Sequence, residues 1–496
     1  MTTETGSRPA APGEEDVYDP ADVAPYSGHH PKVADHIQTH LDEHIAELQR
    51  WLRQPSISSE NVGVADMAQL LRDDLTDLGF GGARVVRTDG HPGVVAFHNA
   101  GAARTLAVYM MYDVQPVEPD DWRSPPFAAE VVDHETGRVV MARGATNQKG
   151  PERAFLNAIS SILAVDGQLP VNLLVVAEGE EELGSPHFPQ VVVACRDELA
   201  ATDGVLFPFN TQNAAGQASF FLGVKGIVYF ELSAAGTAQG GPTRAEIHGS
   251  TQAIVDSPVW RLLQALASLT TPDGNTITIP GYHDAIRPPS AEEMRLLRGM
   301  FRSWDEETYK RTYAVERWID GLNREQALER LLFTTTLNVD GIWAGYTGPG
   351  TKTILPHKAT AKVDSRLVPD QTPEQAIALI RRHLDDNGFS DVEIEVLGGY
   401  PPAQTSVTAP LVEATISVFN KHRCTPTVAP RIAGSAPYYV FTELGLPMLA
   451  AGLGHGSGAH APNEYMVLAP AAGSPIKGLV EVELAYVDLL YALAQT

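Results

Sequence analysis

Short apolar runs of strand type alternate with helical patterns in the first part of the chain, and this alternation most constrains the fold. The strand-type runs cover residues 93–97, 105–109, 171–177 and 204–207, and a helical pattern over residues 151–163 lies among them. Strands that alternate with helices pair into a mostly parallel sheet that is covered on both faces. Ligands of such sheets bind at the carboxyl ends of the strands. The pattern therefore predicts an α/β domain with its functional site at that edge.

A second unit interrupts this pattern. The segment GVKGIVYFELSAAG near residue 223 is typical of a strand, and further strand and helix patterns follow as far as about residue 399. A chain of 496 residues is also too long for one hydrophobic core. We predict that residues 31–219 and 400–496 form a catalytic αβ domain, and that residues 220–399 form an inserted, smaller α+β lid or dimerisation domain.

Composition and charge exclude several classes of protein. The formal net charge of -25 disfavours nucleic acid as a partner, because phosphate recognition needs a basic surface. No apolar run has the length that a bilayer crossing needs, and we expect no secretory signal. The two cysteines, Cys195 and Cys424, cannot form a disulfide framework. We predict a cytoplasmic protein that binds neither membrane nor nucleic acid, with a mobile acidic tail over residues 1–30.

Polar segments occur at four places where predicted strands end. They are MMYDVQPVEPDDWRSPPF (residues 110–127), ARGATNQKGP (142–151), AEGEEELGS (177–185) and GLGHGSGAHAPNEY (452–465). Each segment alone is weak evidence for a site, whereas their order and spacing together are specific. The sequence therefore indicates one site that is assembled from segments far apart in the chain.

Together these segments resemble the zinc exopeptidases of peptidase family M20, which include carnosine dipeptidases, aminoacylases, acetylornithine deacetylase and succinyl-diaminopimelate desuccinylase. Supporting matches are GVKG at Gly223, EIHGS at Glu246, KVDSRLVP through Arg366 and RIAGSAP at Arg431. The resemblance covers nearly the whole chain after residue 30 and is closest to the dipeptidase branch. It implies a zinc-binding domain interrupted by a lid domain that mediates dimerisation, and hence a homodimer.

The family pattern of metal ligands is incomplete in this chain. The resemblance implies two zinc ions that share a bridging Asp, but Met111 stands where a His is expected and Asn147 replaces the Asp. Phe209 stands near the place of a further carboxylate, while Glu182 and His460 match the remaining ligands. Zinc binds imidazole, thiolate or carboxylate, and a thioether or phenyl ring does not suit it. We therefore predict no metal cofactor; one weakly held ion would be bound by Glu182 and His460.

The remaining polar side chains favour acid/base chemistry. Without zinc, Asp113, Glu181 and Glu182 would share a pocket with little positive charge, which raises the pKa of at least one carboxyl group. The resemblance makes Glu181 the principal base, with Asp113, Glu182 and His460 sharing or tuning protons. It also implies that His248 stabilises an oxyanion across a dimer. This set suits proton abstraction, cyclisation, elimination or acyl transfer better than ordinary peptide hydrolysis.

The substrate-binding positions are better preserved than the metal ligands. The residues predicted to bind substrate, most of them from pocket-lining segments of the family, are Asn147, Lys149, Asn338, Arg366, Arg431, Gly434 and Ser435. An Arg guanidinium and backbone donors match a carboxylate. We expect a small amino-acid- or dipeptide-like substrate that carries a carboxylate. Two alternatives stay open: an amidohydrolase or dipeptidase with a single metal, and a non-catalytic ligand-binding homologue.

Overall fold

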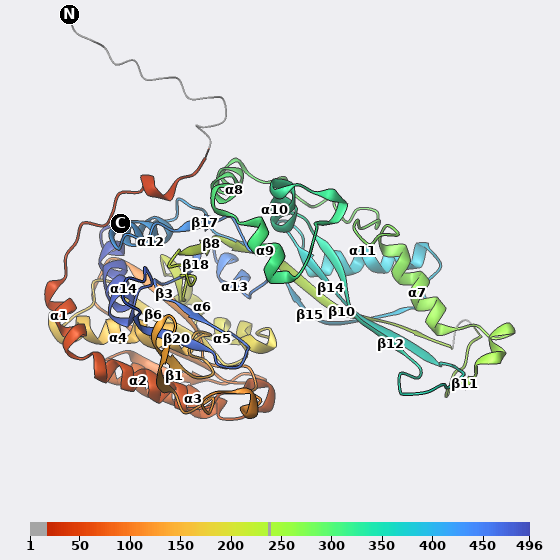
Figure 1. Ribbon diagram of the computed structural model, residues 1–496, viewed down its shortest axis with the longest axis horizontal. Coiled ribbons are helices and arrows are strands. Elements are labelled where there is room, and N and C mark those ends of the chain that lie inside the picture. Colours follow the sequence, from red (N-terminus) through yellow and green to blue (C-terminus); the bar gives the residue numbers. More distant parts are fainter. Residues whose placement is uncertain (1–16, 237–239) are drawn as a thin grey trace, which may run out of the picture.

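A larger and a smaller α/β part make up the chain (Figure 1). The computed structural model describes residues 17–236 and 240–496. The larger part contains both ends of the described chain, and the smaller part, built from its middle, extends from it to one side (Figure 1). Within the described ranges, no helix has the length and apolar character needed to cross a membrane.

The main sheet has the strand order β1-β2-β6-β3-β7-β18. Its strands are β1 (Gly81–Val86), β2 (Gly93–His98), β3 (Thr105–Met111), β6 (Asn172–Glu178), β7 (Gly204–Pro208) and β18 (Met448–Ala451). Neighbours from β6 to β18 run parallel, whereas β1 and β2 join the edge in antiparallel pairs. The sheet confirms the predicted α/β class with a mostly parallel sheet.

Helices cover both faces of this sheet. One face packs against α1 (Pro31–Thr39), α2 (Leu41–Arg53), α3 (Val64–Asp77), α4 (Lys149–Asp166), α12 (Pro410–Lys421) and α14 (Leu479–Leu493). The other face packs against α5 (Phe188–Ala194), α6 (Arg196–Ala200) and α13 (Tyr439–Thr442). Side chains alternate along a strand, so Met110 enters the first apolar cluster and Met111 the second. This alternation decides which face each residue of the first motif serves.

A small antiparallel sheet carries the loops of the second and fourth motifs. It has the order β19-β20-β5-β4, with β4 (Glu130–His134), β5 (Gly137–Met141), β19 (Gly456–Ser457) and β20 (Tyr465–Pro470). The chain leaves β5 directly into the loop at residues 143–147, and the β19–β20 connection holds His460. Pairing of Tyr465 with Met141 holds these two loops side by side.

The smaller part contains an antiparallel sheet of order β12-β14-β10-β15. Its strands and covering helices are β10 (Gly226–Ala235), β12 (Thr336–Ala344), β14 (Lys358–Leu367), β15 (Glu393–Tyr400), α7 (Pro258–Leu269) and α11 (Pro373–Asp386). A separate helical cluster precedes β12 and consists of α8 (Ala291–Ser303), α9 (Glu306–Tyr313) and α10 (Arg324–Phe333). A short strand pair, β11 (Ile247–His248) with β13 (Ile354–Leu355), lies at the far tip (Figure 1).

Short strand pairs mark the junction of the two parts. They are β9 (Gly223–Val224) with β16 (Ala403–Gln404), and β8 (Ser219–Phe221) with β17 (Thr427–Ala429). The chain enters the smaller sheet through Lys225 and leaves it after Tyr400. We keep the domain limits at residues 220 and 400 as a proposal.

Residues 17–30 differ from the predicted mobile tail, because they lie against α12. Asn420 donates to the carbonyls of Pro20 and Val23 at 2.9 and 2.8 Å, and Lys421 donates to that of Gly28 at 2.6 Å. These donors lie about 400 residues further along the chain, so the local composition of the tail contains no sign of them. Residues 1–16 of the predicted tail lie outside the described residues.

Candidate active site

Asp113 joins the first and third motifs. It follows β3, its side chain is fully buried, and its two carboxylate oxygens accept the backbone N–H groups of Glu181 and Glu182, each at 3.1 Å. Burial raises the pKa of Asp113 to about 7, and the charge of Glu182 adds to this effect. Asp113 therefore positions the turn that carries the Glu pair.

Glu181 has the surroundings of a free acid or base. It opens a 3-10 turn, Glu181–Leu183, just after β6. Burial raises its pKa to about 8, with further contributions from the charges of Glu182 and Asp113. In the described part of the chain, no side chain forms a hydrogen bond with its carboxyl group, in contrast to Glu178 and Glu182 nearby. This carboxyl group is free to exchange protons with a ligand.

Glu182, His460 and Asn147 meet at one point. Asn147 Nδ2 lies 2.7 Å from Glu182 Oε1 and 3.1 Å from His460 Nε2, and His460 Nε2 lies 3.2 Å from Glu182 Oε2. Gln115 donates to the same Glu182 oxygen at 2.8 Å. The hydrogen bond with Glu182 raises the pKa of His460. The structure thus brings together polar groups from all four predicted motifs.

Glu464 holds the second motif in place, a role that the sequence did not reveal. Its buried carboxylate accepts the backbone N–H groups of Gly144, Thr146 and Asn147 at 3.0, 2.8 and 2.8 Å. Arg143 adds a bond of 2.8 Å. Glu464 lies in the NEY ending of the fourth motif. Its partners are mostly backbone N–H groups, which every non-proline residue has, so the sequence around them does not indicate this role.

Two positions at which the family resemblance predicts metal ligands are apolar in this chain. Met111 at the end of β3 is buried, and Phe209 just after the adjacent β7 packs against Phe207, with ring centroids 5.8 Å apart. Both side chains belong to or pack on the apolar cluster under α5 and α13. The backbone N–H of Met111 donates to the buried Glu152 at 2.8 Å. These contacts make Met111 a packing residue, whereas Phe209 packs on the cluster and keeps part of its surface accessible.

Lys149, a predicted substrate-binding residue, is fully buried. Its ammonium group lies in the interior and donates to the carbonyls of Trp51 and Gln54 at 3.3 and 2.6 Å. Burial lowers the pKa of Lys149 to about 7. Lys149 therefore anchors the end of α2 to the start of α4. Its partner Gln54 lies 95 residues away in the sequence, so the motif around Lys149 contains no sign of this contact.

Arg366, Ser435 and Asn338 come together at the junction of the two parts. An Arg366 guanidinium nitrogen donates to Ser435 Oγ at 3.0 Å, and its Nε donates to Asp364 at 2.9 Å. Asn338 donates to the same Asp364 at 3.1 Å. Gly434 accepts the backbone N–H of Lys225 at 3.0 Å, which places the Gly434–Ser435 loop against the first junction strand. Arg366 remains partly exposed and can receive a carboxylate.

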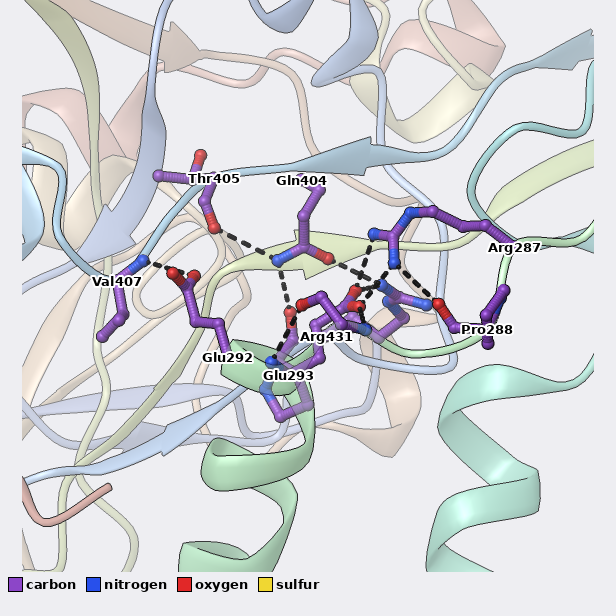
Figure 2. A network of polar contacts seen from close by, with 10 residues as sticks. Arg287, Pro288, Glu292, Glu293, Gln404, Thr405, Val407 and Arg431 are labelled. Atoms are coloured by element: carbon purple, nitrogen blue, oxygen red, sulfur yellow. Dashed lines mark hydrogen bonds and ion pairs between the residues drawn. The ribbon is translucent and has the colours of Figure 1, made fainter. Parts of the chain in front are cut away.

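Arg431, predicted to bind substrate, is instead part of a buried ion pair. Its guanidinium bonds to Glu293 of α8 and donates to Gln404 at 2.9 Å (Figure 2). It also lies 4.8 Å from the ring centre of Phe333. Arg287 binds the same Glu293 at 2.6 Å (Figure 2). Burial lowers the pKa of Arg431 to about 10. Since its charge is already compensated, Arg431 fastens α8 to the junction and is not available to a substrate carboxylate.

His248 lies away from the other predicted catalytic residues. It is exposed in β11, at the end of the smaller part opposite to the main sheet, and its Nδ1 lies 2.8 Å from Ser250 Oγ (Figure 1). Within one chain it cannot reach Glu181. Its action across a dimer stays a prediction.

A family comparison now decides what kind of protein carries this site. The model of peptidase family M20/M25/M40 matches residues 107–472, which include all four motifs. The chain belongs to this peptidase family. It is therefore an enzyme of a family that includes dipeptidases, and the predicted resemblance is confirmed.

Named relatives agree with this assignment. The chain is 28% identical over 408 residues to a Beta-Ala-His dipeptidase of Rattus norvegicus, covering 76% of this chain and 79% of the relative. It is 29% identical over 457 residues to the Cys-Gly metallodipeptidase DUG1 of Candida albicans, covering 85% and 90%. The crystal structure of the M20 family metallo-carboxypeptidase Sso-CP2 from Sulfolobus solfataricus is similar with a TM-score of 0.82 and 33% identity, covering 92% of this chain and 100% of that one.

The prediction that the chain uses no metal cofactor is wrong. The Candida albicans relative is named a metallodipeptidase, and the Sulfolobus solfataricus protein is named a metallo-carboxypeptidase. These relatives are named as metal enzymes, which contradicts the expectation of no metal cofactor.

The donor set fits one ion and does not fit two. A second ion would need donors at Met111 and Phe209, whose thioether and phenyl ring do not suit zinc. Rotation of the Asn147 amide would present its oxygen beside Glu182 and His460, which completes a set of three donors. Across the described ranges, no three His, Cys, Asp or Glu side chains are grouped as a metal site.

Proposed function

We propose that this chain is a dipeptidase-like amidohydrolase that acts on a small amino-acid-derived substrate. The observation that carries this proposal is the position of the free Glu181 carboxyl group beside the cluster of Asn147, Glu182 and His460. Glu181 adjoins Glu182 in the chain, and the charges of Glu182 and His460 both act on the Glu181 carboxyl group. A pocket with this pair suits attack of water on an amide carbonyl.

The chain's own side chains supply the proton transfers. Glu181 takes a proton from the attacking water as the water oxygen bonds to the carbonyl carbon. The same proton then passes to the amine nitrogen as the carbon–nitrogen bond breaks, so the carboxylate is regenerated. Asp113 holds the backbone of Glu181 during this exchange. A divalent ion bound by Asn147, Glu182 and His460 would polarise the scissile carbonyl.

Arg366 supports a substrate with a free carboxylate. Its guanidinium is partly exposed and bonded to Ser435 at the junction of the two parts. A planar guanidinium with a hydroxyl neighbour binds a carboxylate through two parallel hydrogen bonds. This position replaces Arg431 and Lys149 as the anchor for the substrate.

A homodimer is the proposed assembly. The edge strand β12 exposes Val339, Ile342 and Trp343, and α7 exposes Trp260, each with close to half or more of its surface accessible. Apolar side chains on an open sheet edge favour pairing with another chain. Pairing here would leave His248 of one chain free to approach the site of its partner. The cytoplasmic location also stays a prediction.

A second candidate is a proton transfer without net hydrolysis, such as cyclisation or elimination. The apolar replacement of two ligand positions by Met111 and Phe209 favours this candidate, because activation of water is the step that needs the most positive charge. The product distinguishes the two candidates. Hydrolysis yields two products whose masses sum to the substrate plus one water, whereas cyclisation or elimination does not consume water.

The test is mass spectrometry of products formed by the purified protein after loading with Zn²⁺ or Mn²⁺. Its substrates are a panel of dipeptides and N-acyl amino acids. We expect hydrolysis that Glu181→Gln lowers by about 10²–10⁴-fold. Glu180→Gln, which changes the adjacent carboxylate bonded to His187, is the matched control and should retain most activity. Ligand binding without any product would contradict the proposal and support a non-catalytic ligand-binding protein.

A further inference from the structure

Phe209, which stands near a ligand position expected from the family pattern, belongs to a series of packed aromatic rings. Phe209 packs on Phe207, and Phe207 packs on Tyr438 with ring centroids 6.5 Å apart. Tyr438 in turn stacks on Phe221 at 6.5 Å with an interplanar angle of 10°. These residues come from β7, from the turn before α13 and from β8. We call this set of Phe207, Phe209, Phe221 and Tyr438 the aromatic wall.

The wall is partly open and is not merely core. Phe207 and Tyr438 are buried, whereas Phe209 and Phe221 keep part of their surface accessible. Rings that pack on a core cluster and remain partly exposed beside a polar site provide an apolar surface for a ligand. Met111, buried under the same cluster, closes the wall toward β3.

A hydrogen bond places Phe209 beside the loop of the second motif. Asn210, the next residue, donates from Nδ2 to Thr146 Oγ1 at 3.0 Å, and Asn147 follows Thr146 in the chain. Burial raises the pKa of Tyr438, and the charge of Glu181 is the next cause of this rise. Burial likewise raises the pKa of Tyr400. The charge of Glu181 adds to this rise, and the charge of Arg366 opposes it. Phe209 therefore lies next to the loop that carries Asn147, and the charge of Glu181 acts on Tyr438 of the same wall.

We propose that the aromatic wall binds an apolar side chain of the substrate and that Phe209 is its specificity-determining residue. The substrate would then be an amino-acid amide with an aromatic or branched apolar group, and its carboxylate would bind Arg366. This inference rests on the proposed function and extends it. A charged group at the same place would lose its water without gaining a partner, so the wall disfavours acidic or basic side chains.

The size of the preference follows from the area that the wall can cover. Discrimination by an apolar pocket amounts to roughly 10- to 200-fold for a small difference in apolar group. Contact with a half-open wall of two accessible rings falls toward the lower end of this range. We expect a phenylalanine-containing dipeptide to bind at least about 10-fold more tightly than glycylglycine.

The experiment is calorimetric titration of dipeptides into Glu181→Gln protein, so that binding is measured without turnover. Glycylglycine is compared with phenylalanylglycine and with glycylphenylalanine, because the wall could face either residue of the dipeptide. Phe209→Ala should remove most of the preference, whereas Phe209→Leu should retain much of it. Phe97→Ala, at an exposed phenylalanine of β2, is the control for loss of a ring elsewhere. Thermal melting confirms that each variant is folded.

Each outcome bears on a different claim. Equal affinity for all three dipeptides, or an unchanged preference in Phe209→Ala, would overturn the role of the wall and leave the proposed function intact. Failure of every dipeptide to bind the folded protein would overturn both claims. A preference that disappears in Phe209→Ala and persists in Phe209→Leu would establish the wall as the determinant of specificity.

Discussion

Arg431 and Arg366 have the same side chain, but their surroundings predict opposite consequences when each is replaced by Met. Arg431→Met leaves the buried Glu293 carboxylate dependent on Arg287 (Figure 2). Breaking a buried ion pair costs about 3–5 kcal/mol, and the retained Arg287 contact favours the lower end, about 3 kcal/mol. Each kcal/mol lowers the melting temperature of a domain of about 150–250 residues by roughly 2–4 °C. The expected decrease is therefore roughly 6–12 °C, with little change in KM.

Arg366→Met should change binding more than stability. Its ion pair with Asp364 is partly exposed at Arg366, and such pairs contribute about 0–1 kcal/mol. A hydrogen bond to a charged group contributes about 1.5–3 kcal/mol, so loss of the guanidinium should raise KM for a substrate carboxylate roughly 10- to 100-fold. A carboxamide analogue of the same substrate should bind wild type and Arg366→Met with similar affinity.

The assay combines differential scanning calorimetry with steady-state kinetics on both variants. Arg431→Lys is the matched control at the buried site, because it keeps the charge but loses the planar donor geometry. Its melting temperature should fall between those of wild type and Arg431→Met. A normal melting temperature together with a raised KM in Arg431→Met would refute the assignment of Arg431 to structure and return it to the substrate pocket.

Further predictions concern the loop at residues 143–147, acid stability and the dimer. Glu464→Gln should destabilise the protein by about 3–5 kcal/mol and speed hydrogen exchange in that loop, as measured by mass spectrometry; unchanged exchange would contradict its anchoring role. Burial acts to raise the pKa of Glu293, but its arginine partners hold the net pKa below 4.5. The ionised Glu293 carboxylate therefore stabilises the fold above about pH 4.5, and this stabilisation is lost as pH falls through its lower pKa in the folded state. The melting temperatures of wild type and Glu293→Gln should consequently converge on acidification. Mixing inactive His248→Ala with inactive Glu181→Gln should restore activity through mixed dimers; no recovery after subunit exchange would argue against action across the dimer.

The fold was accessible from sequence because its signals are local. Apolar runs of strand type identified β2, β3, β6 and β7, and the helical pattern over residues 151–163 lies within α4. The segment at residues 17–30 was misjudged because the side chains that bind it belong to α12. The composition of residues 17–30 does not indicate that α12 supplies hydrogen-bond donors to their backbone.

The site was accessible to the extent that its residues lie in motifs. Glu181, Glu182, Asp113 and His460 converge as expected, because the motifs follow strands whose ends share an edge. Long-range partners could not be inferred in the same way. Arg431 is 138 residues from Glu293, and neither residue signals the other in sequence. The same limitation applies to Lys149, whose role depends on carbonyl groups of a different helix.

The central claim is a centre for one divalent ion at Asn147, Glu182 and His460. Its most direct test is metal content by plasma mass spectrometry after saturation with Zn²⁺ and removal of the excess. The account predicts one ion per chain, which His460→Ala should lose, and a second ion in the triple variant Met111→His, Asn147→Asp, Phe209→Asp. Two ions in the wild-type chain, or none, would contradict it.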